Sequence, residues 1–413
     1  MEFRIDAKTA RWRQVARDFA NEVVRPIAAE LDAQRNPADA WSWALVEEAD
    51  RRGLRQAPAP AEYGGDDTSY LANTVMLEEI AAADVGSSVV IAQHWKYIHM
   101  IREIATPDQQ RRWLTRIAEN PRAVMAAAFT EPGAGSDNFL PYDAPGAGMQ
   151  TRAERRDGGY VLNGMKHFIS NGNRADVVLT FARTDPDGPL TSSVSLFLVG
   201  ADNPGFSTGR VHDKTGERLA NNAELLYRDA FVAEEDRLGE EGAAMVDVAR
   251  LLRGSNTYAG ACALGVAREC YDRTMAFCRE RVQGGKPIVE HENVGAYLAD
   301  MYLNVDVART YLWRAAWQAG SADTFEGKLG ITPKLVVSER TFDSARKMME
   351  VWGGRGVMKE NGIEKLLRDA AIWLHSDGTN IVMRMKLMNN LRACGPGPEL
   401  WDAVPTEAPA QMV

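Results

Sequence analysis

The residues of this sequence that are best suited to chemistry lie in four short segments that are far apart along the chain. The first, 129–137 (FTEPGAGSD), places two short hydroxyl side chains, Thr130 and Ser136, around Gly133 and Gly135. Glycine lacks the Cβ atom that holds a ligand away from the backbone, so this loop suits close binding of a flat, oxygen-rich ligand. The same residues also suit an ordinary tight turn after a strand. Taken alone, the segment leaves both interpretations open.

The other three segments are 164–172 (GMKHFISNG), 352–356 (WGGRG) and 368–380 (RDAAIWLHSDGTN). The last contains Asp377, the strongest candidate for a general base, because a carboxylate that is removed from water gains basicity and can accept a proton. An aspartate directly before Gly378 also suits the N-cap of a following helix. The two roles are compatible.

Together, and in this order, the four segments resemble the acyl-CoA dehydrogenase superfamily of flavoproteins, from the N-terminal helix to about residue 393. The resemblance implies FAD as cofactor, hydride transfer from Cβ of an acyl-CoA to flavin N5, and removal of the α-proton by Asp377. The usual Tyr-Glu-Gly-Thr of the family is Ser-Asp-Gly-Thr here, at 376–379. Aspartate is one methylene shorter, and misplacement of a base by roughly 1 Å can cost about 100-fold in rate. Either the substrate lies deeper in the site or the reacting carbon differs from that of an unbranched acyl chain. Together with Asn256 in place of an arginine, this departure favours a cyclic, branched or aryl-bearing acyl group.

The resemblance also implies the contacts to FAD. Phe129 and Thr130 would contact the flavin ring, Phe168 would cover one face, and Ser170 would bond N5, although the family more often has tryptophan and threonine at the last two positions. Arg281 would bind the FAD phosphates. The Gly-Gly pair of the third segment would meet the cofactor of a neighbouring subunit. The expected cofactor-binding residues are Phe129, Thr130, Ser136, Phe168, Ile169, Ser170, Arg281, Glu350, Gly353, Gly354, Thr379 and Asn380.

Several positions depart from the family pattern. Glu292 and Glu350 stand where glutamine is common, which removes hydrogen-bond donors near the phosphates, and Gly284 stands where phenylalanine is usual. Asn256 takes the place of an arginine near the CoA, and Arg253, one turn earlier, can substitute in part. The expected substrate-binding residues are Ser136, Arg253, Asn256 and Gly378.

A predicted helix over 86–104 carries four further residues that either face the pocket or serve the structure: His94, Trp95, Lys96 and His99. The loop over 138–148 is longer than in common members of the family and is expected near the substrate entrance.

Composition limits the class of protein. A chain of 413 residues suits two or three domains. A net charge of −9 argues against nucleic acid or an anionic membrane surface as partner. The start lacks the apolar core of a signal peptide, and no apolar run is long enough to span a membrane, so a soluble cytoplasmic protein is expected. The four cysteines form no CxxC pair and read as free thiols, and the six histidines show no metal-binding spacing.

Periodicity predicts an α+β multidomain protein. Residues 1–121 read as an all-helical domain, in which Pro26 kinks or ends the first helix. Residues 122–238 read as an antiparallel β-domain that contains a hairpin with its turn at 157–159. Residues 239–395 read as a four-helix bundle, in which apolar residues from Val294 to Ala315 hold one helix face, and 396–413 read as a mobile tail. This order of domains is also what the family resemblance implies.

The function favoured by the sequence is FAD-dependent α,β-dehydrogenation of an acyl-CoA thioester. The resemblance implies an electron-transfer flavoprotein as electron acceptor and a homodimer or homotetramer. Two alternatives stay open. One is oxidation of a non-CoA substrate, because nitroalkane oxidases of the superfamily use an aspartate base and flavin monooxygenases share the scaffold. The other is a non-enzymatic binding protein on this fold.

Overall fold

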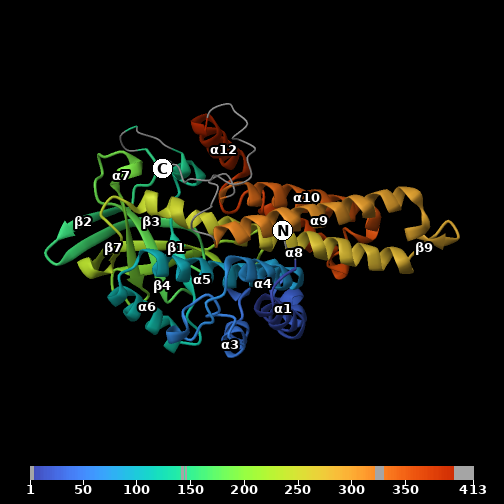
Figure 1. Ribbon diagram of the computed structural model, residues 1–413, viewed down its shortest axis with the longest axis horizontal. Coiled ribbons are helices and arrows are strands. Elements are labelled where there is room, and N and C mark those ends of the chain that lie inside the picture. Colours follow the sequence, from blue (N-terminus) through green and yellow to red (C-terminus); the bar gives the residue numbers. More distant parts are fainter. Residues whose placement is uncertain (1–3, 141–143, 145–146, 321–329, 395–413) are drawn as a thin grey trace.

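The computed structural model describes residues 4–140, 144, 147–320 and 330–394, without the side chains of 249–253 and 393–394. Figure 1 shows the strands at one end of the molecule and long helices extending from them to the other end. The predicted tail, 396–413, lies outside the described residues. The predicted fold class is confirmed, with helices first, a sheet next and helices last.

The N-terminal part is helical. A π-helical turn, Ala20–Val24, interrupts the first helix directly before Pro26. Proline has no N–H for the usual bond and its ring crowds the preceding turn, so the helix widens there. The predicted end of the helix at Pro26 is therefore wrong, because the chain continues through the proline as α2, and the prediction of a kink stays untested. The helices are α1 (Ala7–Phe19), α2 (Arg25–Asp32), α3 (Trp43–Arg51), α4 (Tyr70–Ala83), α5 (Val85–Ile104) and α6 (Pro107–Glu119).

The middle part is a mainly antiparallel sheet of eight strands in the order β6-β7-β3-β2-β4-β5-β8, with β1 parallel to β4. The predicted hairpin is present, because β2 and β3 pair Arg156 with Gly159. A short helix, α7 (Leu190–Ser193), precedes β5. The strands are β1 (Met125–Ala128), β2 (Arg152–Arg156), β3 (Gly159–Ser170), β4 (Val177–Arg183), β5 (Val194–Gly200), β6 (Phe206–Val211), β7 (Asn222–Ala233) and β8 (Arg237–Leu238).

The C-terminal part is a helical bundle. In Figure 1, α8, α9 and α10 run side by side away from the sheet to a two-stranded hairpin, β9 (Val282–Gln283) and β10 (Lys286–Pro287). The apolar face predicted for α9 is buried at Leu298, Met301 and Val305 and onwards along the helix. The helices are α8 (Ala244–Glu280), α9 (Glu292–Ala319), α10 (Thr332–Trp352), α11 (Ile363–Ile372) and α12 (Asn380–Cys394).

One large apolar core joins the N-terminal helices, one face of the sheet and α8, and this continuity fixes the three parts against one another. Cys262, Cys270 and Cys278 are buried free thiols, as predicted. Among the described helices, none combines the length and the apolar character needed to cross a membrane.

Candidate active site

A cavity of about 1200 Å³ lies where the three parts of the chain meet. Its walls come from one face of α5, the loop after β1, the end of β3, the segment after β6, the first third of α8 and the connection between α11 and α12. Three of the four sequence segments, 129–137, 164–172 and 368–380, contribute residues to this cavity. The segment 352–356 does not.

The loop after β1 is held against β3. The Thr130 hydroxyl donates a hydrogen bond to the His167 carbonyl, and the His167 N–H donates to the Thr130 carbonyl at 2.8 Å. Gly133 lines the cavity, and a Cβ atom added there would meet no atom within 4 Å. Phe129 stacks on Phe139 with ring centroids 4.9 Å apart. The loop therefore offers open backbone and an aromatic surface to a ligand.

Phe168 and Ser170 lie at the end of β3, where a β-bulge interrupts pairing with β7. Phe168 has a φ of +62° and its side chain is 57% exposed. A bulky aromatic residue with positive φ is a costly conformation that persists where a site requires it. The Asn222 amide donates to Ser170 Oγ at 3.3 Å, and the buried Asn222 Oδ1 has no partner among the described residues. Ile169, between them, points into the sheet core.

Asp377 lies in the connection between α11 and α12 and lines the cavity. Its φ is +50° and that of Gly378 is +90°, so two successive residues adopt left-handed backbone. The Ser136 hydroxyl accepts a hydrogen bond from the Thr379 N–H at 3.0 Å, which ties this turn to the loop after β1. The turn holds the Asp377 carboxylate at the boundary between the β-domain and the bundle.

Lys96 on α5 forms an ion pair with that carboxylate. Its Nζ lies 2.5 Å from Asp377 Oδ2, with the lysine side chain 9% exposed and the aspartate side chain 27% exposed. Of the four α5 residues singled out in the sequence, only Lys96 lines the cavity. Trp95 donates to the Leu54 carbonyl at 2.8 Å, and His99 contacts the Tyr258 hydroxyl at 2.9 Å.

His94 is fully buried, and burial holds its pKa well below the ordinary value, so the ring is neutral. Burial likewise lowers the pKa of His99 to about 3. These two histidines belong to the core of the N-terminal helices and are not groups of the site.

Lys334, near the start of α10, is a site residue that the sequence analysis did not single out. Its Nζ donates to the Gly378 carbonyl at 2.6 Å and to Asn380 Oδ1 at 2.6 Å. Burial lowers the pKa of Lys334 to about 8, against the opposing attraction of the Asp377 carboxylate. Lys334 therefore supports the turn that carries Asp377.

The structure does not bring every predicted residue to the cavity. Asn256 lines it, and its amide donates to the Gly330 carbonyl. Asn380 faces Lys334 and Ser338 instead. The side chain of Arg253 lies outside the described part of the molecule.

The remaining predicted cofactor residues lie at the other end of the bundle. Trp352 stacks on Phe277 near the end of α8 with ring centroids 4.0 Å apart, close to the β9 hairpin seen at the tip of Figure 1. Within one chain, these residues lie away from the cavity walls: Arg281, Glu350, Gly353 and Gly354. The contacts with FAD that the family resemblance implies for these residues stay a prediction.

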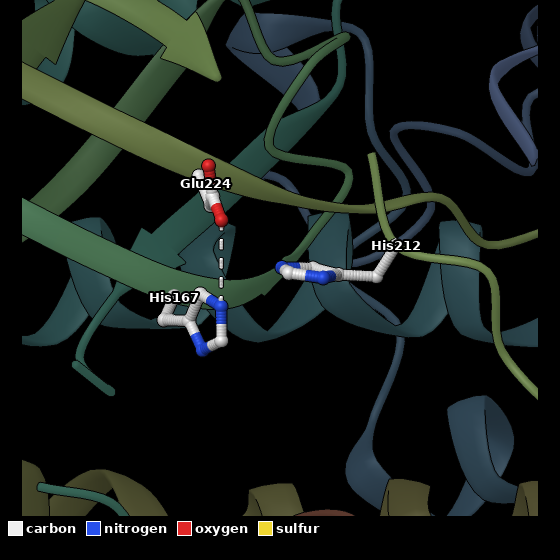
Figure 2. A group of neighbouring side chains, drawn as sticks. All are labelled: His167, His212 and Glu224. Atoms are coloured by element: carbon white, nitrogen blue, oxygen red, sulfur yellow. Dashed lines mark ion pairs between the residues drawn. The ribbon is translucent and has the colours of Figure 1, made fainter. Parts of the chain in front are cut away.

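A cluster that sequence spacing did not reveal lies beside Phe168. His167, His212 and Glu224, from β3, the segment after β6, and β7, present ligand atoms within 4.8 Å of one another (Figure 2). Glu224 is already engaged, because its Oε1 lies 3.6 Å from Arg210 Nε and its Oε2 accepts from the Arg210 N–H at 3.1 Å. A bound cation would compete with that guanidinium for the same carboxylate.

The fold and the cavity define a class of protein: three packed parts, helical, β and helical, with one ligand site at their junction. The sequence matches the N-terminal domain of acyl-CoA dehydrogenases over residues 7–121, the middle domain over 126–230 and the C-terminal domain over 248–391.

Individual relatives agree with this match. A cyclohex-1-ene-1-carbonyl-CoA dehydrogenase of Geobacter metallireducens is 32% identical, covering 90% of this chain and 94% of the relative. The structure of butyryl-CoA dehydrogenase from Megasphaera elsdenii is 28% identical with a TM-score of 0.88, covering 95% of this chain and 100% of that one. The structure of PigA with FAD and proline is 25% identical with a TM-score of 0.86, covering 96% and 100%. The chain belongs to the acyl-CoA dehydrogenase family, a family of FAD-dependent oxidoreductases, which confirms the resemblance drawn from the four motifs.

Proposed function

We propose that this protein dehydrogenates an acyl-CoA thioester between Cα and Cβ, with Asp377 as the base that removes the α-proton. The observation that carries the proposal is the position of Asp377, whose carboxylate lines the same cavity as Phe129, Phe168 and Ser170. Strained backbone at both Phe168 and Asp377 supports a functional rather than a purely structural origin for this arrangement.

The residues of the cavity fit FAD. The exposed Phe168 ring needs an apolar cover, and the unpartnered buried Asn222 Oδ1 needs a donor. Gly133 leaves room for backbone approach, and Thr130 and Ser170 place hydroxyls at the wall. When bound there, FAD supplies the acceptor for the hydride that leaves Cβ.

The protein's own residues have separate tasks in this proposal. Asp377 takes the proton from Cα, and its backbone N–H donates to the thioester oxygen, which stabilises the charge that develops there. Lys334 and Ser136 hold the turn by binding the Gly378 carbonyl and the Thr379 N–H. A base held this rigidly needs little reorganisation during the reaction.

The acceptor and the assembly are part of the proposal. We infer that an electron-transfer flavoprotein receives the electrons. We also infer a homodimer or homotetramer in which Arg281, Glu350 and the Gly353–Gly354 pair of one subunit reach the cofactor of the next. Light scattering after size-exclusion chromatography tests the assembly, and a monomer that retains FAD would contradict the shared site.

The test of the activity is anaerobic addition of a panel of acyl-CoA thioesters to the purified protein, with absorbance of the bound flavin near 450 nm as readout. Rapid bleaching by a thioester and slow reoxidation in air are expected. Fast oxygen consumption with a nitroalkane or another non-CoA substrate, and no bleaching by any thioester, would replace the dehydrogenase assignment with an oxidase or monooxygenase.

A further inference from the structure

Lys96 places a positive charge inside the cavity, beside the proposed base. It lies on the face of α5 that lines the cavity, together with Val89, Gln93, Tyr97 and Met100. A largely buried ammonium group is unfavourable unless it is paired with an anion. Its only partner among the described residues is the Asp377 carboxylate.

This pairing conflicts with the task of Asp377. When Asp377 accepts a proton from the substrate it loses its negative charge, and Lys96 then becomes a buried charge without a partner. In addition, the carboxylate oxygen that contacts Lys96 is not free to approach a substrate carbon. A second anion that takes over Lys96 during the reaction removes both difficulties.

We propose that this second anion is a carboxylate on the acyl group, so that the substrate is a short dicarboxylic acyl thioester and Lys96 is its binding group. The inference rests on the dehydrogenase function proposed above. On binding, the ion pair between Lys96 and Asp377 is exchanged for one between Lys96 and the substrate. No covalent step is added to the reaction, in which the α-proton passes to Asp377.

The surroundings of Lys96 suit a carboxylate. The Tyr97 hydroxyl donates to Gln93 Oε1 at 2.6 Å, which orients the Gln93 amide nitrogen as a donor that has no other described partner. A carboxylate has two oxygens, and an ammonium and an amide on neighbouring turns of one helix face can bind both. An unbranched aliphatic acyl chain would bury these groups without partners.

The geometry also limits the length of the acyl group. Lys96 Nζ lies 2.5 Å from the proposed base, so the substrate carboxylate must lie within a few bonds of the reacting carbon. Succinyl, glutaryl and adipyl thioesters meet this condition, and they replace the cyclic, branched or aryl-bearing acyl group expected from the shorter base alone. A long-chain dicarboxylic thioester would carry its charge beyond Lys96.

The experiment compares glutaryl-CoA with pentanoyl-CoA, which replaces the carboxylate by a methyl group. Flavin bleaching gives kcat/KM for each thioester in the FAD-loaded wild type and in Lys96→Met. The wild type is expected to prefer glutaryl-CoA by about 10- to 100-fold, the usual size of a charged hydrogen bond. Lys96→Met is expected to abolish or reverse this preference.

A binding measurement provides a readout that does not depend on turnover. In Asp377→Asn, calorimetry gives dissociation constants for both thioesters, and adding Lys96→Met is expected to weaken glutaryl-CoA binding about 10-fold or more. Lys214→Met is the matched control, because Lys214 also lines the cavity but is paired with Glu217 at 3.2 Å. This control should leave the ratio of the two thioesters unchanged. Lys96→Gln replaces Lys96→Met if the latter does not fold.

The outcomes separate this inference from the function on which it rests. Equal losses on both thioesters in Lys96→Met would show that Lys96 only positions Asp377, and would overturn the inference. Faster bleaching by pentanoyl-CoA in the wild type would also overturn it while supporting the dehydrogenase function. Absence of bleaching by every thioester would instead remove the proposed function, and equal dissociation constants in Asp377→Asn would then reject the inference as well.

Discussion

Two carboxylates, the buried Glu79 and the partly buried Asp377, are paired in contrasting ways. Glu79 on α4, with a side chain only 4% exposed, is held by three arginines from α1 and α8: Arg13 at 2.6 Å, Arg17 at 3.0 Å and Arg268 at 2.9 Å. Asp377, at the cavity, has one cationic partner within ion-pair distance among the described side chains, Lys96, and retains 27% exposure. The Glu79 carboxylate accepts from three guanidinium groups, whereas Lys96 contacts only one oxygen of the Asp377 carboxylate.

The contrast separates a structural ion pair from an exchangeable one. Lining the cavity is not the deciding property, because Glu131 also lines it and yet accepts bonds from Lys166 at 2.8 Å and from the N–H groups of Gln150 and Thr151 at 2.5 and 2.9 Å. A carboxylate with every acceptor position filled cannot take a proton from a ligand without breaking the fold. Asp377 can.

The largest effect is expected at Asp377. Asp377→Asn should retain FAD and lower the rate of flavin reduction by about 10³-fold or more, because the proton acceptor is lost. Its free energy of unfolding should fall by about 1 to 2 kcal/mol, less than at a fully buried ion pair, because Lys96 loses its anion but lies at the wall of an open cavity. Stopped-flow absorbance and urea titration measure the two quantities. Undiminished reduction would remove Asp377 from the mechanism.

The opposite pattern is expected at Glu79. Glu79→Gln should lower the free energy of unfolding by about 3 kcal/mol, because it leaves a cluster of arginines without their anion. The rate of flavin reduction per bound flavin should stay within about 2-fold of the wild type, since Glu79 lies outside the cavity walls. If Glu79→Gln unfolds like the wild type but reduces its flavin much more slowly, the contrast between Glu79 and Asp377 is wrong.

The contribution of Glu79 should also depend on pH. Burial opposes its ionisation, but hydrogen bonds and charges from Arg17, Arg268 and Arg13 outweigh burial and lower its pKa to about 2 from an ordinary 4.5. A lowered carboxyl pKa means that the stabilisation is complete above pH 4.5 and is lost as the pH falls towards 2. The difference between wild type and Glu79→Gln should shrink over that window in urea titrations.

Lys334 gives a test at alkaline pH. Its pKa of about 8 in the folded protein lies below the ordinary 10.5, so the unfolded chain binds more protons between these values. The wild type should therefore gain stability relative to Lys334→Met as the pH rises from 8 to 10.5. Urea titrations at several pH values measure this, and a constant difference would show that Lys334 does not titrate in this range.

The smallest effect is expected from removing one donor of a saturated carboxylate. Arg13→Gln leaves Glu79 with Arg17 and Arg268, so the loss of unfolding free energy should be about 1 kcal/mol or less. Thermal unfolding measures it. A loss as large as that of Glu79→Gln would show that the three arginines act as one indivisible unit.

Local patterns were sufficient to predict the fold class. The hairpin of β2 and β3 and the buried face of α9 follow from periodicity. The placement of Phe129, Phe168 and Asp377 at one cavity was implied by the family resemblance of the motifs. β6 was not predicted, because none of its residues is buried and it shows no buried apolar alternation.

Contacts between distant segments could not be predicted in the same way. Lys96 and Asp377 are 281 residues apart, and nothing in either segment specifies that their charges meet. Lys334 belongs to an ordinary helix start, and His167, His212 and Glu224 come together only through sheet pairing. Such pairs depend on how whole elements pack, which short-range periodicity does not record.

Each wall of the cavity is supplied by a different part of the chain: α5 by the N-terminal helices, the end of β3 by the sheet, and the turn at Asp377 by the bundle. No one of these parts can form the pocket by itself. Uptake of the flavin must therefore be a late event in maturation, after the three parts have docked. The yellow colour of a preparation, relative to its protein content, then reports the fraction of molecules that have completed assembly.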